Sequence, residues 1–218
     1  MLPKSPRLLA ALDLLTEVRC LADVGTDHGY FPIAAVQSGK ASRAVASDNK
    51  PAPLATAAEH IARSGLQDRI DLVLADGLSF LRVDIAAVSI MGMGGFLIER
   101  ILDAADLSAV EQLILGPNND HAAVRGWLED HGWRIADERF VRDRGHDYQL
   151  ISAVPGKMSL CPDERTYGPI LLKTRNEGLL GHLRQKIAAL SEARSLARDP
   201  DKRQELEIRI RNLEELIR

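Results

Sequence analysis

The spacing of hydrophobic and polar residues predicts alternating strands and helices over the first two thirds of the chain. Short apolar runs bounded by turn residues indicate buried strands, and apolar residues three or four apart indicate helices. The expected strands cover residues 20–24, 42–47, 70–75, 85–91 and 112–115. The expected helices cover residues 6–17, 30–37, 54–63, 96–102 and 121–130. Strands that alternate with helices imply an α/β fold with a doubly wound parallel sheet.

Two later segments, 133–142 and 148–154, alternate between apolar and polar residues and are joined through Gly145. This pattern is typical of an antiparallel pair of strands. We expect the pair to close the parallel sheet with a reversed edge.

The pattern changes after Pro155 to one that predicts two long helices. Asp199 and Pro200 form a helix cap and a first-turn proline between two runs of heptad spacing. The seam positions are Leu180, Leu183, Ile187, Leu190 and Ala197 in the first run, with Arg194 at one position, and Leu206, Ile210, Leu213 and Ile217 in the second. The sequence therefore predicts one domain over residues 1–155 and a helical hairpin over residues 156–218. The heptads fit pairing within one chain or between two, so a monomer and a weak homodimer both remain open.

Composition narrows the class of protein. A chain of 218 residues with 45% apolar residues can bury one α/β core with a small extension. The net charge is −3, but residues 173–218 hold eleven Lys and Arg against eight Asp and Glu, which leaves −6 for the rest. A polyanionic partner would bind this tail first, although mixed charge on a solvated helix face gives the same pattern.

The chain offers no sequence signal for a metal site, a secretion signal or a membrane anchor. Cys20 and Cys161 are far apart and lack a C-x-x-C motif, so we expect reduced thiols and no metal. Asp13 and Glu17 interrupt the apolar N-terminal run, which indicates an amphipathic helix and not a signal peptide. No eighteen consecutive apolar residues occur, so we expect a cytoplasmic protein without contact to a membrane.

The segment 21–30, LADVGTDHGY, carries the strongest functional signal, because an apolar strand that ends in Asp-Val-Gly and leads into a helix is typical of nucleoside-cofactor sites. The dinucleotide motif G-x-G-x-x-G is not satisfied, since Asp27 and Tyr30 stand where the second and third glycines belong. A carboxylate there would repel a pyrophosphate. S-adenosylmethionine has no phosphate and carries a sulfonium and an amino group, so it fits this loop better than NAD or FAD.

Carboxylates and glycines also follow the next strands, at the edge where ligands bind in such sheets. Asp48 comes 23 residues after Gly25, the spacing at which an acidic side chain accepts both ribose hydroxyls. Asp76, after the third strand, would meet the adenine amino group. Each aspartate alone is equally explained as a turn residue. The predicted cofactor residues are Asp23, Gly25, Thr26, His28, Asp48, Asn49, Asp76, Gly77, Met91, Gly92 and Met93.

Several motifs together resemble the bacterial TrmK family, the tRNA (adenine-22-N1)-methyltransferases. They read D-V-G-T-D-H-G-Y-F-P, D-N-K-P-A-P, A-D-G-L, M-G-M-G-G-F-L-I, G-P-N and R-G-W-L-E-D-H-G-W. The resemblance implies a class I, Rossmann-like methyltransferase domain, S-adenosyl-L-methionine as cofactor, tRNA as substrate and a coiled-coil-like C-terminal domain. The chain departs from the family at Ser47-Asp48-Asn49, where a glycine and a glutamate are usual, and at Gly116, where a glutamine is usual.

Asp27 is the predicted catalytic residue. N1 of adenine is a neutral nucleophile, so positioning provides most of the catalysis, and the methylated ring becomes cationic. A hydrogen bond from the adenine N6 amino group to a carboxylate becomes stronger as this positive charge develops. Capping of the following helix is the alternative role for Asp27. Tyr30 would stack on a base, and Gly94 and Asn118 would border it, although each also fits a purely structural role.

Cations near both ends of the chain are the predicted contacts to tRNA phosphates, because such contacts provide most of the affinity for nucleic acid. The candidates are Lys4, Arg7, Arg175, Arg184, Lys186 and Arg194, and each is also explained as a solubilising charge. Two further hypotheses remain open. One is a methyltransferase that acts on a small molecule or a protein, and the other is a catalytically silent RNA-binding module.

Overall fold

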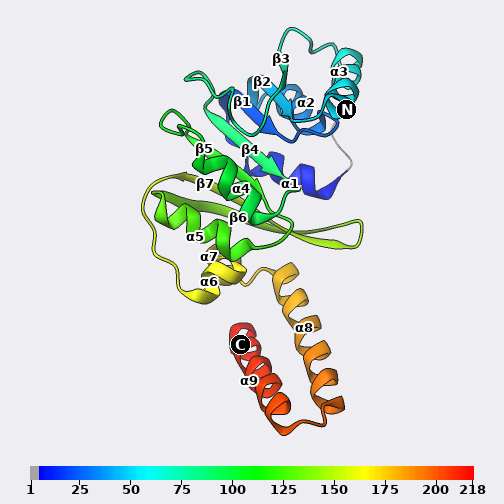
Figure 1. The fold of residues 1–218 in the computed structure, drawn as a ribbon, viewed down its shortest axis with the longest axis vertical. Helices are drawn as coiled ribbons and strands as arrows, with labels where there is room; N and C mark the ends of the chain where they lie inside the picture. Colours follow the sequence, from blue (N-terminus) through cyan, green and yellow to red (C-terminus); the bar gives the residue numbers. More distant parts are fainter. Residues whose placement is uncertain (1–4) are drawn as a thin grey trace.

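The computed structural model describes residues 5–218 and contains a seven-stranded sheet with strand order β3-β2-β1-β4-β5-β7-β6 (Figure 1). Strands β1 to β5 are parallel, and β7 pairs antiparallel with both β5 and β6, which confirms the reversed edge. The strands are β1 (Val18–Val24), β2 (Ala41–Asp48), β3 (Ile70–Leu74), β4 (Ala87–Met91), β5 (Gln112–Gly116), β6 (Trp133–Asp143) and β7 (His146–Pro155).

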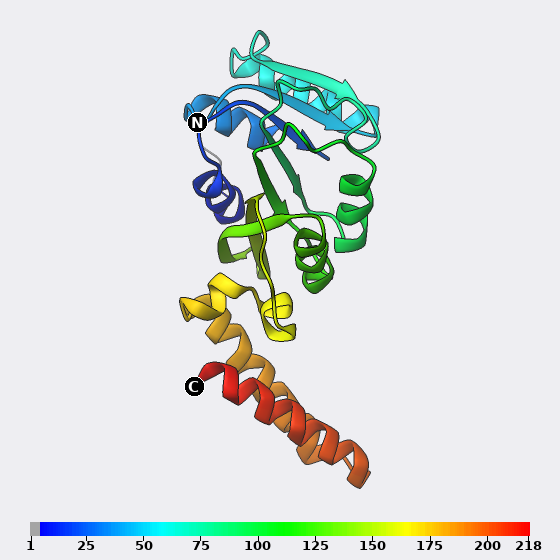
Figure 2. The same ribbon diagram turned by 90° about the vertical axis from the view of Figure 1, so that its left-hand side faces the viewer.

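Helices cover both faces of the sheet, as expected for a doubly wound fold (Figure 2). One core lies between the sheet and the first three helices, and includes Leu21 of β1. The other lies beneath α4 and α5, and includes Ala22. Successive residues of β1 therefore serve opposite cores, which is why the central strands are mostly apolar on both faces. The helices of this domain are α1 (Pro6–Leu14), α2 (Tyr30–Gln37), α3 (Pro51–Arg63), α4 (Gly95–Asp103) and α5 (His121–Asp130).

Helix α1 ends at Leu14, three residues before the predicted end, because a buried side chain of the sheet binds its last turn. The amide nitrogen of Gln112 donates to the Leu14 carbonyl at 2.8 Å, and its amide oxygen accepts from the backbone and hydroxyl of Thr16 at 3.0 and 2.9 Å. At the other end, the Ser5 hydroxyl accepts from the Leu8 amide and donates to Asp143 at 2.5 Å. These contacts hold α1 across β6 and β7.

Two short helices, α6 (Pro162–Tyr167) and α7 (Pro169–Lys173), follow β7 and were not predicted. They pack against α5 and β6 around a fully buried ion pair in which Arg125 Nη2 lies 2.8 Å from Glu138 Oε1. Arg125 also donates to the Arg165 carbonyl at 3.0 Å, and Glu138 Oε2 accepts from the Ile170 amide at 2.9 Å. The region after Pro155 thus begins on the surface of the α/β domain, and a domain division at 155 stays a prediction.

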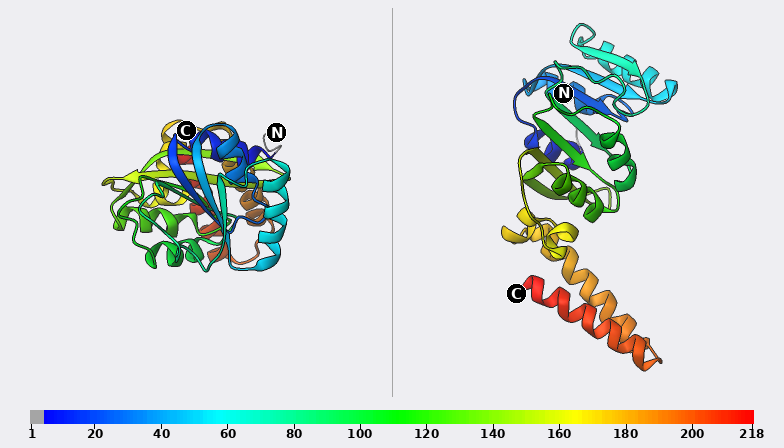
Figure 3. Two further views of the ribbon diagram at one scale, coloured as in Figure 1. Left: turned by 90° about the horizontal axis from the view of Figure 1, so that it is seen from above. Right: turned by 60° about the vertical axis from the view of Figure 1, so that its left-hand side comes forward.

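The last two helices, α8 (Glu177–Leu196) and α9 (Pro200–Ile217), form the predicted antiparallel hairpin, and they pair within the chain (Figures 1 and 2). Asp199 caps α9 by accepting from the Asp201 amide at 3.1 Å, and Arg194 pairs with Glu207 across the two helices. Ala197 lies just past the end of α8, so the predicted seam is one position too long. The hairpin projects beyond the β6 edge, away from the rest of the sheet (Figure 3).

Candidate active site

A cavity of about 350 Å³ lies where the β1 loop, α1 and the ends of β4 and β5 meet; we name it the Asp27 cavity. It brings together the predicted cofactor residues of the β1 and β4 loops and most of the predicted base-binding residues. Its lining is Arg7, Leu8, Asp23, Gly25, Thr26, Asp27, His28, Tyr30, Phe31, Met91, Gly92, Asn118 and Tyr148.

Asp27 itself stands at the mouth of this cavity in an unusual backbone conformation. Its φ is +51°, in the left-handed region that non-glycine residues rarely adopt, and its side chain is 74% exposed. The N-cap position of α2 belongs to Gly29, where no side chain caps the helix. The capping role considered for Asp27 is therefore wrong. Strained residues of this kind cluster at functional sites, and here the strain presents a carboxylate to the cavity.

Asp23 lies deeper in the same cavity and is buried. Its Oδ1 accepts a hydrogen bond of 2.5 Å from the Ser89 hydroxyl of the neighbouring strand. Burial raises the pKa of Asp23 to about 6, although the Ser89 hydrogen bond opposes the shift. The hydroxyl oxygen of Thr26 is also buried; the Thr26 side chain lowers the pKa of Asp23, but the hydroxyl makes no hydrogen bond of normal geometry in the described chain. The floor of the cavity therefore holds an acid and a hydroxyl that are available to a polar ligand.

One wall of the cavity is built from residues far apart in the sequence. The Arg7 guanidinium from α1 lies 4.8 Å from the centre of the Tyr148 ring on β7, and Arg7 Nε is buried with no partner among residues 5–218. Opposite, the amide nitrogen of Asn118 donates to the Gly92 carbonyl at 2.7 Å, which ties the β4 and β5 loops together. Because Asn118 lines the cavity, its side-chain amide is within reach of a ligand there.

A second cavity, of about 270 Å³, opens on the other side of Gly25; we name it the Asp48 cavity. It contains the remaining predicted cofactor residues, and Gly25 lines both cavities. Asp48 Oδ1 accepts from the Lys50 amide at 2.9 Å, which leaves Oδ2 for a ligand. The lining is Val24, Gly25, Asp48, Asn49, Lys50, Ala75, Asp76, Gly77, Met93, Leu97, Arg100 and Ile101.

Gly25 is favoured at the junction of the cavities by its conformation. Its φ is +71°, which strains any other residue, and a Cβ there would also displace the terminal methyl of Met93. The backbone amides of Gly25 and Thr26 both donate to the Ser47 carbonyl at 2.9 Å, which fixes the loop. A ligand that spans both cavities would cross bare backbone at this point.

Four predicted substrate residues lie outside both cavities. Gly94 is the N-cap of α4, and a Cβ on it would lie 3.0 Å from Asn119 Oδ1. Arg175 donates to the Ile217 carbonyl at 2.7 Å, Arg184 lies 3.9 Å from Glu177, and the Lys186 ammonium lies over the Tyr167 ring.

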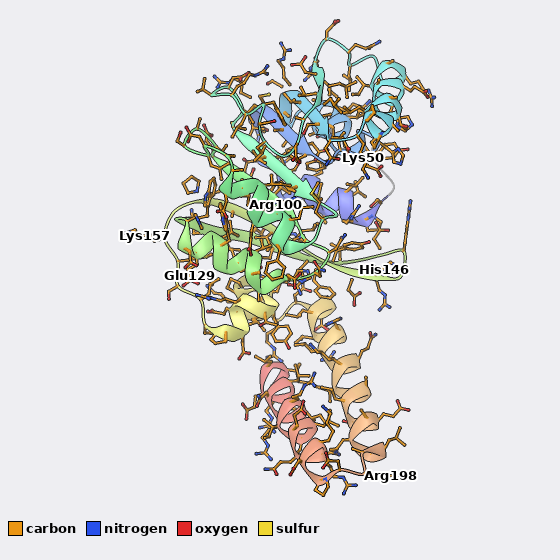
Figure 4. All side chains as sticks on the ribbon, in the orientation of Figure 1. Lys50, Arg100, Glu129, His146, Lys157 and Arg198 are labelled. Atoms are coloured by element: carbon orange, nitrogen blue, oxygen red, sulfur yellow. The ribbon has the colours of Figure 1, made fainter. Side chains whose placement is uncertain are left out.

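Figure 4 labels Lys50, in the Asp48 cavity, and Arg198, between α8 and α9, at well separated places. The Asp48 cavity and the far end of the hairpin are therefore distant from one another. Lys4 lies outside the described residues.

Sequence reasoning missed Tyr148 in the first cavity and Lys50 and Arg100 in the second. Lys50 directly follows the predicted Asp48-Asn49 turn, so its place could have been inferred from that motif. Arg100 stands one helical turn after Phe96 and lines the same cavity as Asp48 only because α4 packs beside the sheet. Tyr148 belongs to an alternating strand, and no local signal separates it from its neighbours.

The described part of the chain contains no group of three or more His, Cys, Asp and Glu residues arranged to hold a metal ion. In residues 5–218, no helix combines the length and the apolar character needed to cross a membrane.

Comparison with known proteins finds relatives that match nearly the whole chain. Residues 21–215 match the family model TrmK, tRNA (adenine(22)-N(1))-methyltransferase. The tRNA (adenine(22)-N(1))-methyltransferase of Bacillus subtilis is 31% identical over 98% of this chain and 96% of its own length. A Streptococcus pneumoniae protein solved with S-adenosyl-L-methionine superposes with a TM-score of 0.89 at 31% identity, over 100% of both chains. The TrmK of M. capricolum, solved with S-adenosyl-homocysteine, gives 0.85 at 28% identity over 98% and 99% of the chains.

Proposed function

Since this chain belongs to the TrmK family, we propose that it transfers a methyl group from S-adenosylmethionine to N1 of an adenine in tRNA, at position 22. The products are 1-methyladenosine and S-adenosylhomocysteine. The observation that carries the proposal is the pair of cavities that meet at Gly25, one with Asp48 and Asp76, the other with Asp27, Tyr30 and Asn118. Because tRNA is the substrate, the enzyme acts in the cytoplasm.

The residues present fit S-adenosylmethionine. Asp48 offers a free carboxylate oxygen for ribose hydroxyls, and Asp76 offers an acceptor for an adenine amino group in the same cavity. On the other side of Gly25, Asp23 and the buried Thr26 hydroxyl suit the ammonium group of the amino acid end. When bound, the cofactor supplies an electrophilic methyl group.

The residues of the Asp27 cavity position and stabilise the target base. The Asp27 carboxylate accepts a hydrogen bond from the N6 amino group, and its charge favours the cationic ring that forms as N1 gains the methyl group. Asn118 lines the same cavity and accepts or donates at the edge of the base. No general base is needed, because N1 carries no proton to remove. Arg7 neutralises a backbone phosphate at the mouth of the cavity.

The hairpin cations guide the rest of the tRNA. Arg175, Arg184 and Lys186 lie on or next to α8, which projects from the β6 edge and so extends the surface that an RNA can contact. Their contribution is electrostatic and independent of sequence.

The test is methylation of unmodified tRNA with labelled S-adenosylmethionine, followed by nuclease digestion and chromatography of the nucleosides. We expect a 1-methyladenosine peak. Asp27→Asn removes the charge but retains the shape, so we expect it to slow turnover about 10- to 100-fold. This is at the lower end of the effects known for one electrostatic contact, because Asp27 is exposed to solvent. Calorimetry with S-adenosylmethionine should give the same dissociation constant for both proteins. Cofactor binding without any methylated nucleoside would refute the proposed function.

A further inference from the structure

Three aromatic rings form a contiguous group beside the mouth of the Asp27 cavity; we name His28, Tyr30 and His60 the ring cluster. The rings of Tyr30 and His60 are stacked, with centroids 4.9 Å apart and planes 19° apart. The His28 ring is tilted against both, with its centroid 5.5 Å from Tyr30 and 6.0 Å from His60. His28 and Tyr30 line the cavity, whereas His60 does not. The proposed function assigns no role to His60.

The sequence brings His60 to this place through a close approach of two helices. Gly29 precedes α2 with φ of +72°, and a Cβ on it would lie 3.2 Å from the Cβ of Ala57 on α3. This allows α3 to place His60, one turn after Ala57, against Tyr30. Nδ1 of His60 lies 2.9 Å from the His28 carbonyl oxygen, which can only accept, so His60 donates and its ring is fixed.

Burial of the rings does not explain the cluster. Tyr30 remains 47% exposed, and neither histidine belongs to the cores of the described chain. A metal site does not explain it either, since no metal-holding group of side chains occurs in residues 5–218. Nε2 of His28 lies 3.4 Å from Asp27 Oδ2, which accounts for the place of His28 but not for that of Tyr30 or His60. Tyr30 thus presents an exposed ring beside the cavity, and His60 packs against the inner face of that ring.

We propose that the ring cluster stacks the base of a nucleotide adjacent to the target adenine. This inference rests on the proposed function. An adenine that leaves its stack to reach the Asp27 cavity deprives its neighbour of a stacking partner, and an aromatic side chain can replace that partner for any base. Tyr30 makes the contact. His60 is a positioning residue that occupies the inner face of Tyr30, so that the ring presents one orientation to the RNA.

The experiment combines changes in the protein with changes in the RNA. The RNAs are full-length tRNA and two tRNAs with an abasic nucleotide directly 5′ or 3′ of the target adenine. The proteins are the wild type, His60→Asn, His60→Phe and Tyr30→Leu. Asparagine can still donate to the His28 carbonyl but has no ring, whereas phenylalanine keeps the ring without the hydrogen bond. The dissociation constant for each RNA is measured at one fixed salt concentration.

For the wild type, one of the two abasic tRNAs should bind about tenfold more weakly than intact tRNA, the size expected for one base stack. His60→Asn and Tyr30→Leu should bind intact tRNA about tenfold more weakly than the wild type does. Their affinity should not fall further when intact tRNA is replaced by that abasic tRNA. His60→Phe should behave like the wild type within about twofold. The dissociation constant for S-adenosylmethionine should be the same in all four proteins.

Two results would overturn the inference. One is that the affinity of His60→Asn or Tyr30→Leu falls a further tenfold with the abasic tRNA. The other is that His60→Asn binds intact tRNA as tightly as the wild type does. If His60 has a purely structural role, His60→Asn should bind S-adenosylmethionine more weakly than the wild type. The abasic nucleotide should then weaken tRNA binding by His60→Asn as much as it weakens binding by the wild type. Failure of the proposed function is distinguishable, because it shows as absence of 1-methyladenosine from the wild type whatever the affinities are.

Discussion

The buried carboxylate of Asp23 should make the stability of this protein fall as the pH rises. The pKa of Asp23 is about 6 in the folded chain, against a value of 3.8 when it is not buried. Both states hold the proton well below pH 4, so the folded protein has the full contribution there. Above pH 4 the unfolded state releases the proton into water without burying a charge. The folded state must either keep the proton or bury the charged carboxylate, and either alternative costs free energy relative to the unfolded state. Stability is therefore lost between about pH 4 and 6.

The size of the loss follows from the shift. One pKa unit corresponds to about 1.4 kcal/mol, so a shift of about two units amounts to about 3 kcal/mol at neutral pH. Asp23→Asn has the same shape and cannot ionise. The free energy of unfolding of this variant, relative to that of the wild type, should accordingly rise by about 3 kcal/mol between pH 4 and pH 8.

Urea unfolding at a series of pH values measures this difference, and other titrating groups cancel because both proteins contain them. Ser89→Ala is the matched control, since the Ser89 hydroxyl donates to Asp23 and favours its ionised form. Without that hydrogen bond the pKa of Asp23 rises further, so the loss of stability should become larger and extend to higher pH. A constant difference between wild type and Asp23→Asn from pH 4 to pH 8 would refute the reasoning. S-adenosylmethionine should stabilise the wild type more than Asp23→Asn at pH 8, because the cofactor places positive charge near the buried carboxylate.

Three other substitutions test the rest of the structure. Gly25→Ala forces a side chain into a φ of +71° and against Met93, so calorimetry should show about tenfold weaker binding of S-adenosylmethionine, and an unchanged affinity would contradict the fit at Gly25. Arg125→Met leaves Glu138 buried without its partner and should lower the free energy of unfolding by about 3–5 kcal/mol in urea, whereas a loss below about 1 kcal/mol would show that the ion pair is not needed. Replacing Arg184 and Lys186 by glutamate should raise the KM for tRNA and reduce the slope of log affinity against log salt concentration by about two. The affinity for S-adenosylmethionine is the control and should not change. An unchanged slope would show that these cations do not contact phosphates.

The sequence by itself determined the features that depend on neighbours along the chain. The alternation of strands and helices, the reversed edge after Gly145 and the capped start of α9 at Asp199 all follow from local periodicity and turn chemistry. Asp27 and Asp48 could be assigned to one site because parallel strands end at the same edge of a sheet, wherever the helices pack. The predicted cofactor residues accordingly line the two adjoining cavities.

Only the tertiary structure decided which distant residues complete that site. Arg7 and Tyr148 meet because Gln112 holds α1 across the sheet, and His60 reaches Tyr30 because Gly29 lets two helices approach. The short helices α6 and α7 have too few residues for a periodic pattern and are held by a buried ion pair. Such contacts depend on packing between elements, and the identity of a side chain does not reveal which element it will meet. Pairing of α8 with α9 was open for the same reason, since a heptad pattern fits a partner helix from either chain.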